Sequence, residues 1–347
     1  MLNSMYPVEW PESEGNDLLH AERSPASLSI DAIVPAYKAQ CYIEKCIEGL
    51  FSAGFDARNI IVVDDCSPDT TAQQVRALGI EPITMETNCG PAEARNVGAR
   101  ASNADILLFV DCDVVIAPDS RSRLAVFFES RPDYAAVFGS YDNRPECTSP
   151  VSRFRNLLHR HVHIESAGEA VTFWTGCGAV RRDAFNQVGG FDSGQRMMED
   201  VKLGLELHAD GQRIWLDPSM QGKHLKRWTL SSMFHTDMIH RAIPWTRLLR
   251  TNIGKASSYA LNLGWRGRIS GLSVLGSIAS LALMIAYPLA GALGIFAAFA
   301  VLITANASFL QMMQRECGWG EAALAVPLLW VHYLSACLGY AYARANS

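Results

Sequence analysis

The C-terminal part of the chain contains two long stretches without a charged residue. They run from Ile269 to Ala305 and from Ala322 to Ala343. A helix needs roughly 20 apolar residues to cross a hydrocarbon core of about 30 Å, and each stretch is long enough to do so. Residues 1–268 instead carry charged side chains throughout, as soluble domains do. The sequence therefore predicts a soluble-type domain joined to a membrane-embedded end.

The predicted membrane end, residues 269–347, divides into three helices. Tyr287-Pro288 interrupts the first uncharged stretch, and a polar link containing Arg315 precedes the second. We expect a multi-pass protein of the cell (inner) membrane, with the soluble domain on the cytoplasmic side. An alternative is a re-entrant hairpin followed by one true span. The three expected spans cover about 269–286, 289–310 and 322–342.

A basic segment, residues 229–268, precedes the first expected span. From Lys223 to Arg268 there are nine Lys or Arg residues, opposed only by Asp237. Trp, Phe and Leu side chains are interspersed among them, which is typical of an amphipathic segment that lies in the membrane interface and contacts membrane lipids. An excess of Lys and Arg beside a span also marks the cytoplasmic flank. The alternative is a solvated basic helix.

Composition excludes several classes of protein. The net charge of −5 argues against a general nucleic-acid binder, so we expect no nucleic-acid partner. The nine cysteines include no C-x-x-C pair, which argues against a zinc ribbon or a thioredoxin-like site and suits a reducing compartment. Residues 1–28 are acidic, contain three prolines and have no apolar core segment, so we expect a mobile N-terminal tail.

Residues 29–228 alternate short apolar runs with helical patterns. Such alternation predicts an α/β, Rossmann-like domain with a mostly parallel sheet. The expected strands are Ile30–Pro35, Ile60–Val63, Ile80–Met85, Ile106–Val110, Tyr134–Phe138, Phe173–Arg182 and Arg213–Leu216. The expected helices include Ile43–Phe51, Thr71–Leu78, Ala92–Ala101 and a helix opened by Glu199-Asp200 that runs to Ala209.

Polar clusters follow three of the expected strands. They are Pro35-Ala36-Tyr37, Asp64-Asp65-Cys66-Ser67 and Asp111-Cys112-Asp113. Turns favour Asp and Ser, so any one cluster alone is most simply a turn. In an open parallel sheet, however, ligands bind outside the carboxyl ends of the strands. Three clusters at that edge predict a ligand site.

Three histidines, His159, His161 and His163, are a second group of possible metal ligands. They have no cysteine or carboxylate partner at ligand spacing, so we expect them to form a polar surface instead.

Residues 30–228 resemble a glycosyltransferase family 2 domain of the GT-A fold. The resemblance rests on six motifs in order, one of which replaces the glycine of the common V-D-D-G-S pattern with Cys66. The motifs are Ile33-Val34-Pro35-Ala36-Tyr37, Val62-Val63-Asp64-Asp65-Cys66-Ser67-Pro68-Asp69, Asn88-Cys89-Gly90-Pro91-Ala92-Glu93-Ala94-Arg95-Asn96, the D-x-D sequence Asp111-Cys112-Asp113, Gly189-Gly190-Phe191-Asp192 with Glu199-Asp200, and His224.

The resemblance implies a nucleotide-sugar donor, UDP- or GDP-linked, and a Mg²⁺ or Mn²⁺ ion. It implies that Asp200 is the catalytic base with Glu199 beside it, that Arg227 faces the diphosphate and that Trp228 faces the acceptor. The residues implied at the donor are Pro35, Tyr37, Asp65, Arg95, Asp111, Arg227 and Trp228. Those implied at the metal are Asp111, Asp113 and His224.

Elementary chemistry agrees with these roles. Mg²⁺ and Mn²⁺ prefer oxygen ligands and are commonly held by one or two carboxylates together with substrate phosphates. Asp200 opens a helix, so we expect the helix dipole to keep its carboxylate ionised at pH 7. Arg227 and the metal are expected to stabilise negative charge on the leaving diphosphate.

The combined interpretation is a membrane-bound inverting glycosyltransferase, a metal-dependent enzyme of the hexosyltransferase type. It would transfer one sugar to a lipid-linked or other membrane-proximal glycan acceptor. One alternative is a processive polysaccharide synthase, and a second is a non-catalytic membrane scaffold. Processive synthases carry a Q-x-x-R-W box, and here His224 stands in place of the glutamine.

Overall fold

The computed structural model describes residues 28–251 and 264–346. The expected N-terminal tail, apart from Leu28, and part of the basic segment lie outside the described residues. One sheet of nine strands forms the centre of the α/β domain, in the order β3-β2-β1-β4-β8-β6-β9-β5, with β7 paired to β9. The strands are β1 (Ile30–Ala36), β2 (Ile60–Asp64), β3 (Ile83–Thr84), β4 (Ile106–Phe109), β5 (Val114–Ile116), β6 (Tyr134–Tyr141), β7 (Gly168–Ala170), β8 (Gly178–Arg181) and β9 (Arg213–His224).

The sheet is mixed. Strands β3, β2, β1 and β4 are mutually parallel, as the sequence predicts for βαβ units. Beyond β4 the sheet is no longer all parallel, because β8 runs antiparallel to both β4 and β6. Strand β9 is parallel to β6 but antiparallel to β5 and β7. Antiparallel neighbours need no crossover helix, so the βα alternation of the sequence does not reveal this half of the sheet.

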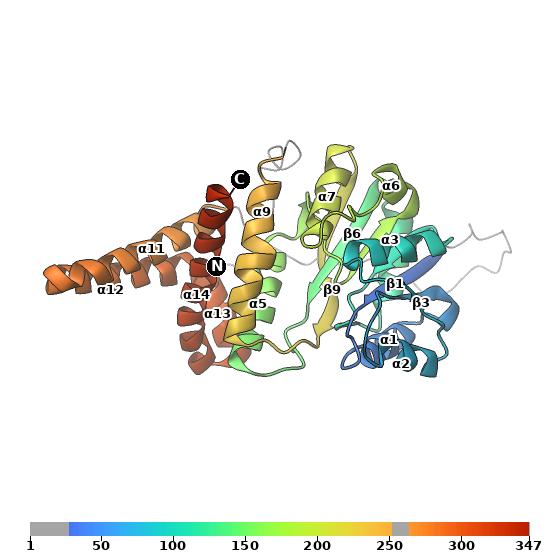
Figure 1. Cartoon of the computed structure of the whole chain (residues 1–347), viewed down its shortest axis with the longest axis horizontal. Helices are drawn as coiled ribbons and strands as arrows, with labels where there is room; N and C mark the ends of the chain where they lie inside the picture. Colours follow the sequence, from blue (N-terminus) through green and yellow to red (C-terminus); the bar gives the residue numbers. More distant parts are fainter. Residues whose placement is uncertain (1–27, 252–263, 347) are drawn as a thin grey trace, which may run out of the picture.

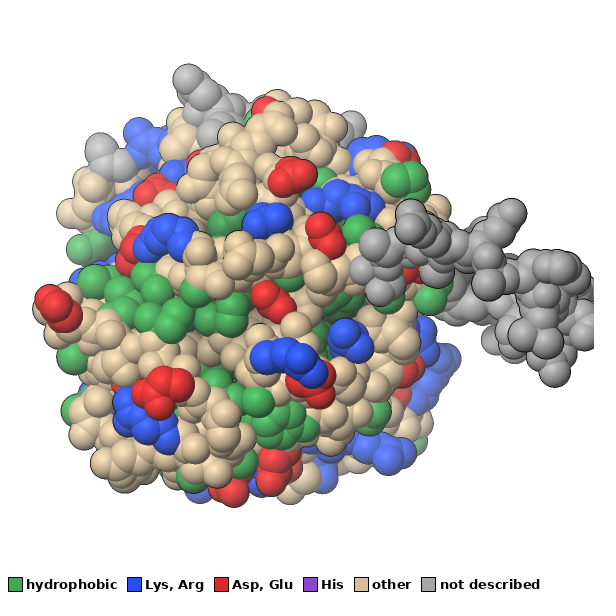
Figure 2. Space-filling view, turned by 90° about the vertical axis from the view of Figure 1, so that its right-hand side faces the viewer, with side chains coloured by type: hydrophobic (Ala, Val, Ile, Leu, Met, Phe, Trp, Pro, Cys, Tyr) green, Lys and Arg blue, Asp and Glu red, His purple; other side chains and the backbone are tan. Residues whose placement is uncertain are grey.

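Helices cover both faces of the sheet, and each face has its own core. Residues of α1, α2 and α4 pack on one face, including Ile47, Val75 and Leu124. Residues of α3, α6 and α7 pack on the other, including Phe185 and Leu203. The helices are α1 (Ile43–Ser52), α2 (Thr71–Ala77), α3 (Pro91–Ala101), α4 (Ser120–Ser130), α5 (Pro150–Glu165), α6 (Arg182–Gln187) and α7 (Glu199–Ala209). On the side turned away from the C-terminal helices, acidic and basic side chains are interspersed (Figure 2).

The C-terminal part is helical. A continuous helical run consists of α8 (Leu230–His235), the π-helical turn η2 (Thr236–Ala242) and α9 (Ile243–Leu248). It is followed by α11 (Trp265–Ala286), α12 (Pro288–Ala305), α13 (Ala307–Cys317) and α14 (Trp319–Ala345). Helices α11, α12 and α14 are long and apolar enough to cross a membrane. The second apolar helix ends at Ala305 rather than near residue 310, and Asn306 separates it from α13.

A third hydrophobic cluster joins the α/β domain to the C-terminal helices. Phe154 and Leu157 of α5 pack there with Trp228, with Phe309 of α13 and with Leu329 of α14, and Leu302 near the end of α12 also belongs to it. Helices α11 and α12 instead form a hairpin that projects away from the rest of the molecule (Figure 1). The described part of the basic segment therefore packs against other helices, since Met233 is fully buried in the same cluster.

Candidate active site

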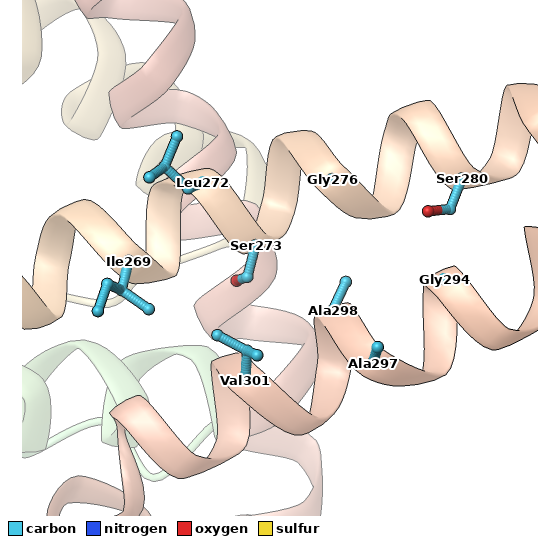
Figure 3. Close-up of a pocket in the computed structure, with 9 residues that line it drawn as sticks. All are labelled: Ile269, Leu272, Ser273, Gly276, Ser280, Gly294, Ala297, Ala298 and Val301. Atoms are coloured by element: carbon cyan, nitrogen blue, oxygen red, sulfur yellow. The ribbon is translucent and has the colours of Figure 1, made fainter.

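The structure brings the three polar clusters together at one edge of the sheet. Strand β1 lies between β2 and β4, so the residues that follow all three strands are neighbours. The backbone N–H of Asp65 donates to the carbonyl of Ala36, and that of Lys38 donates to Ser67 Oγ. A groove of about 330 Å³ between α11 and α12 is lined by apolar, Gly and Ser residues without a carboxylate (Figure 3), so the sheet edge is the better candidate.

The residues expected at the nucleobase differ in accessibility. Tyr37 is 43% exposed, whereas Pro35 is buried in β1. The buried carboxylate of Asp65 accepts hydrogen bonds from Asn88 Nδ2 and from the backbone N–H groups of Cys89 and Gly90, at 2.7–3.0 Å. In this structure Asp65 therefore anchors the loop that leads into α3, and Tyr37 is the side chain that is accessible to a nucleobase.

Arg95 is a buried bridge between two carboxylates. Its Nη1 lies 2.6 Å from Glu199 Oε1, and its Nη2 lies 2.6 Å from Asp111 Oδ1. Burial opposes the positive charge, but Asp111 and Glu199 outweigh it and raise the pKa of Arg95. The guanidinium thus faces the protein's own acids. Any influence of Arg95 on a nucleotide would pass through the orientation of Asp111.

This bridge predicts a large stability difference between two arginine variants. Arg95→Met leaves Asp111 and Glu199 buried or half-buried without their partner, so the free energy of unfolding should fall by about 3–5 kcal/mol. Arg100→Met removes only an exposed pair with Glu93, which is worth about 0–1 kcal/mol. Urea unfolding of the two variants in detergent measures the difference, and equal losses would contradict the bridging role.

The acidic pair Glu199-Asp200 lies at the start of α7, as expected. Glu199 is buried and is held by Arg95, while Asp200 Oδ1 accepts a hydrogen bond from the N–H of Val201. Burial, together with the negative charge of Glu199, raises the pKa of Asp200 to about 7. The expectation that the helix dipole keeps this carboxylate fully ionised at pH 7 is therefore wrong, because burial and a like charge outweigh the dipole. A carboxylate that titrates near neutral pH suits general-base catalysis.

Asp113 and His224 form the second polar pair of the site. Pairing of β5 with β9 sets His224 opposite Val114 and leaves its Nε2 3.6 Å from Asp113 Oδ2. Burial tends to raise the pKa of Asp113, but its interaction with the neighbouring His224 contributes to lowering it overall. Asp113 is therefore held as an anion.

Asp111, the third expected ligand, turns toward other partners. Its Oδ1 accepts from Arg95 and, at 3.3 Å, from Thr175 Oγ1. Within residues 28–251 and 264–346, no group of three or more His, Cys, Asp or Glu side chains is arranged to hold a metal. Asp113 and His224 nevertheless fit a divalent ion whose remaining ligands are phosphate oxygens and water.

An aromatic cluster behind His224 was not predicted. The Tyr141 ring stacks on His224 with centroids 4.4 Å apart, and Trp174 and His159 contact the Tyr141 ring.

The expectation that the three histidines form a polar surface is wrong, because α5 turns them inward. His163 Nδ1 lies 2.8 Å from the Gly139 carbonyl oxygen. Burial lowers the pKa of His163 to about 4. The i, i+4 spacing of His159 and His163 indicates that both lie on one face of a helix, and this was the sequence signal for their arrangement.

Arg227 and Trp228 lie in different surroundings. Arg227 is exposed, whereas Trp228 is buried in the cluster that joins α5 to α13 and α14. Arg155 lies 5.3 Å from the Trp228 ring, and the indole Nε1 is buried without a hydrogen-bond partner in the described part of the chain. Arg227 is thus free to meet a phosphate, and Trp228 links the site to the C-terminal helices.

The chain is similar to known glycosyltransferases. Residues 31–189 match the model of glycosyl transferase family 2. An uncharacterized glycosyltransferase of Haemophilus influenzae is 27% identical over 184 residues, which cover 51% of this chain and 61% of that protein. Succinoglycan biosynthesis protein ExoO of Rhizobium meliloti is 27% identical over 232 residues, 61% of this chain and 65% of ExoO. The matches thus span less than two thirds of these relatives.

A solved structure shares the fold. The mannosyltransferase PcManGT from Pyrobaculum calidifontis, in complex with GDP-Man and Mn²⁺, superposes with a TM-score of 0.56 at 18% sequence identity. The match covers 91% of this chain and 87% of that protein. The α/β fold inferred from the sequence is confirmed, and three apolar helices follow it.

Proposed function

We propose that this chain is a membrane-bound inverting glycosyltransferase, because residues 31–189 match the glycosyl transferase family 2 model and the fold is shared with a solved mannosyltransferase. Its donor is a UDP- or GDP-sugar, and its acceptor is a lipid-linked or other glycan at the membrane surface. The observation that carries the proposal is the sheet edge. There the anionic Asp113 lies beside His224, and Asp200, with a pKa near 7, is joined to Asp111 through Glu199 and Arg95.

The donor half of the site consists of the exposed Tyr37, the Asp113–His224 pair and the exposed Arg227. Tyr37 offers an aromatic face to the nucleobase, and Arg227 offers a cation to the diphosphate. Asp113 and His224 would hold Mg²⁺ or Mn²⁺, as the solved mannosyltransferase does hold Mn²⁺ with GDP-Man. When bound, the metal supplies positive charge that stabilises the diphosphate leaving group.

Asp200 serves the acceptor. An acceptor hydroxyl oxygen attacks C1 of the donor sugar while the bond from C1 to the diphosphate oxygen breaks. Asp200 takes the hydroxyl proton, and the electron pair of the broken bond leaves with the diphosphate. Glu199 pairs with Arg95 and keeps the guanidinium oriented. Attack opposite the leaving group inverts the configuration at C1, a stereochemistry proposed from the family resemblance.

The C-terminal helices set the location of the reaction. We place the protein at the inner cell membrane with its catalytic domain in the cytoplasm, since Arg241, Arg247 and Arg250 precede the apolar helices. Trp228 lies between the site and those helices. A polyprenyl phosphate, a lipid-linked sugar or a glycolipid could reach the sheet edge from the bilayer surface, and these acceptors fit the proposal best.

The base role of Asp200 predicts a pH profile. Only the ionised carboxylate accepts a proton, and burial raises its pKa to about 7. The value of kcat/KM should therefore fall tenfold per pH unit well below pH 7 and level off above it. Initial rates from pH 5.5 to 8.5, with donor binding measured at each pH, separate this effect from loss of donor. A flat profile over that range would contradict the assignment.

Donor binding tests the first half of the proposal. The purified protein is titrated calorimetrically with a panel of UDP- and GDP-sugars, with Mn²⁺, with Mg²⁺ and with a chelator. We expect one nucleotide class to bind, with an affinity that depends on the metal. Absence of binding to every sugar nucleotide under all conditions would favour the non-catalytic scaffold.

A further inference from the structure

The three apolar helices are not equivalent in their surroundings. We propose that, among the described residues, only the α11–α12 hairpin enters the bilayer, and that α14 lies along the membrane surface, held on the α/β domain. The end of α14 is then on the same side of the membrane as the catalytic domain. The proposal rests on the membrane attachment proposed above but not on sugar transfer.

The hairpin has the properties of a membrane insert. Helices α11 and α12 have no charged residue beyond Arg268, and their windows of highest hydropathy are only 17% and 11% buried. Large apolar side chains on both helices point outward, among them Ile285 at 88% exposure and Phe296 at 76%. The 22 and 18 residues of the two helices correspond to about 33 and 27 Å, close to the hydrocarbon thickness. Trp265 and Arg266 mark the base of the hairpin.

Helix α14 instead packs on neighbouring helices along most of its length. Ala322, Ala325 and Leu329 are buried in the cluster that contains residues of α5 and α13. A Cβ added to Gly339 would lie 2.5 Å from Ala242 Cβ, so α14 also packs closely on the helical run that contains η2. Ala343, one turn further, is 1% exposed. The buried stripe thus runs from the first turn of α14 to its last.

Ionic contacts reinforce this attachment at two levels of α14. Near its start, Glu321 pairs with Arg153 of α5 at 3.1 Å. In its middle, His332 Nδ1 lies 2.7 Å from Asp237 Oδ2, and Arg155 lies 2.7 Å from the other oxygen of Asp237. If α14 left this position, it would lose its ion pair with Arg153 of α5 and the contact of His332 with the buried Asp237 of η2.

The cost of immersion decides between the two arrangements. If α14 crossed the bilayer in this packing, α5 would lie at membrane depth beside it, with Arg153, Arg155 and Arg160. An arginine at the centre of a membrane helix costs about 2.5–3.5 kcal/mol on insertion scales. Keeping α14 outside the core avoids that cost, whereas the hairpin enters the core without carrying any charged residue with it.

The position of α14 relative to the hairpin fits a surface location. Contacts between the two converge on the middle of α14, where Trp330 donates to Ser277 and Cys337 donates to the Gly271 carbonyl. Helix α14 therefore runs across the base of the hairpin, as Figure 1 shows. Trp319 at its start and Tyr340 and Tyr342 near its end are each at least half exposed. Trp and Tyr are typical of the membrane–water interface.

The side on which α14 ends can be measured directly. The full chain receives one protease-cleavable tag before residue 1 and a different one after residue 347, and sealed inside-out vesicles are prepared from the producing cells. We expect added protease to remove both tags without detergent. Removal of the N-terminal tag alone, with the C-terminal tag cleaved only after detergent, would mean that α14 spans and would overturn the proposal. A chain that washes off the vesicles at high salt would overturn the attachment itself.

A matched pair of variants provides a second readout. Leu281→Arg places a charge on α11 at a position 55% exposed, and Leu338→Arg places one on α14 at a position 42% exposed. Neither side chain is buried, so both variants should fold. We expect Leu281→Arg to lower the membrane-bound fraction at high salt at least several-fold, and Leu338→Arg to leave it unchanged. An equal loss in both variants would count against the proposal.

Discussion

Asp200→Asn should lower the rate of sugar transfer by roughly 10²–10⁴-fold, the usual contribution of general-base catalysis, while donor affinity stays within a few-fold of wild type. Asn has the size of Asp and can still accept a hydrogen bond from the N–H of Val201. It cannot take the acceptor's proton. Because burial already raises the pKa of Asp200, a neutral side chain at this position should also be tolerated by the fold. Steady-state rates and calorimetric donor binding measure the two effects separately.

Two further carboxylate variants on α7 serve as comparisons for Asp200→Asn. Glu199→Gln should reduce transfer less, and should also lower the melting temperature, because Glu199 holds the buried Arg95. Glu206→Gln on the same helix removes a carboxylate that pairs with Lys202, and transfer should stay near normal. A larger loss in Glu199→Gln than in Asp200→Asn would move the base to Glu199. Near-normal transfer in both variants would remove the pair from the chemistry.

Asp113→Ala should abolish the metal dependence of donor binding and weaken donor affinity at least as much as the 10–100-fold that supporting residues of metal sites typically cost. Asp113 is kept anionic beside His224, and its carboxylate is the oxygen ligand that a divalent ion prefers. His224→Ala should weaken binding less, because phosphate and water can replace one nitrogen ligand. Titration with the donor, with and without Mn²⁺, checks both variants.

The control for this experiment is Asp119→Ala. Asp119 pairs with Arg123 on the surface of α4, so its removal should leave donor binding and metal dependence unchanged. Unaltered affinity and unaltered metal dependence in Asp113→Ala would show that the Asp113–His224 pair does not hold the ion.

Local sequence signals were sufficient for the parallel half of the fold. The apolar runs that became β1, β2 and β4 were predicted within one or two residues, and α7 begins at Glu199 and ends at Ala209 as expected. Strand β3 is shorter than predicted because Pro82 has no N–H to donate. The directions of β8 and β9 depend on pairing between distant segments, which no local pattern encodes.

The location of the site at the sheet edge was predictable from the sequence, but the ion pairs that connect its residues were not. Polar residues after β1, β2 and β4 had to meet once those strands were neighbours. That Arg95 would join Asp111 to Glu199 depends on how α3 and α7 pack on the sheet, and the raised pKa of Asp200 follows from that packing. Likewise, the apolar lengths predicted candidate spans, whereas tertiary contacts such as those of His332 and Glu321 distinguish α14 from the hairpin.

Transfer of a labelled sugar to a membrane lipid tests the central claim most directly. Membrane vesicles that contain the full chain are supplied with each radiolabelled UDP- or GDP-sugar and Mn²⁺, and the organic-soluble fraction is counted and analysed by mass spectrometry. We predict a lipid product that carries one added sugar, formed by wild type and absent with Asp200→Asn. A polymeric product would identify a processive synthase instead. Absence of any transferred label from all donors, with the protein folded and membrane-bound, would contradict the proposed function.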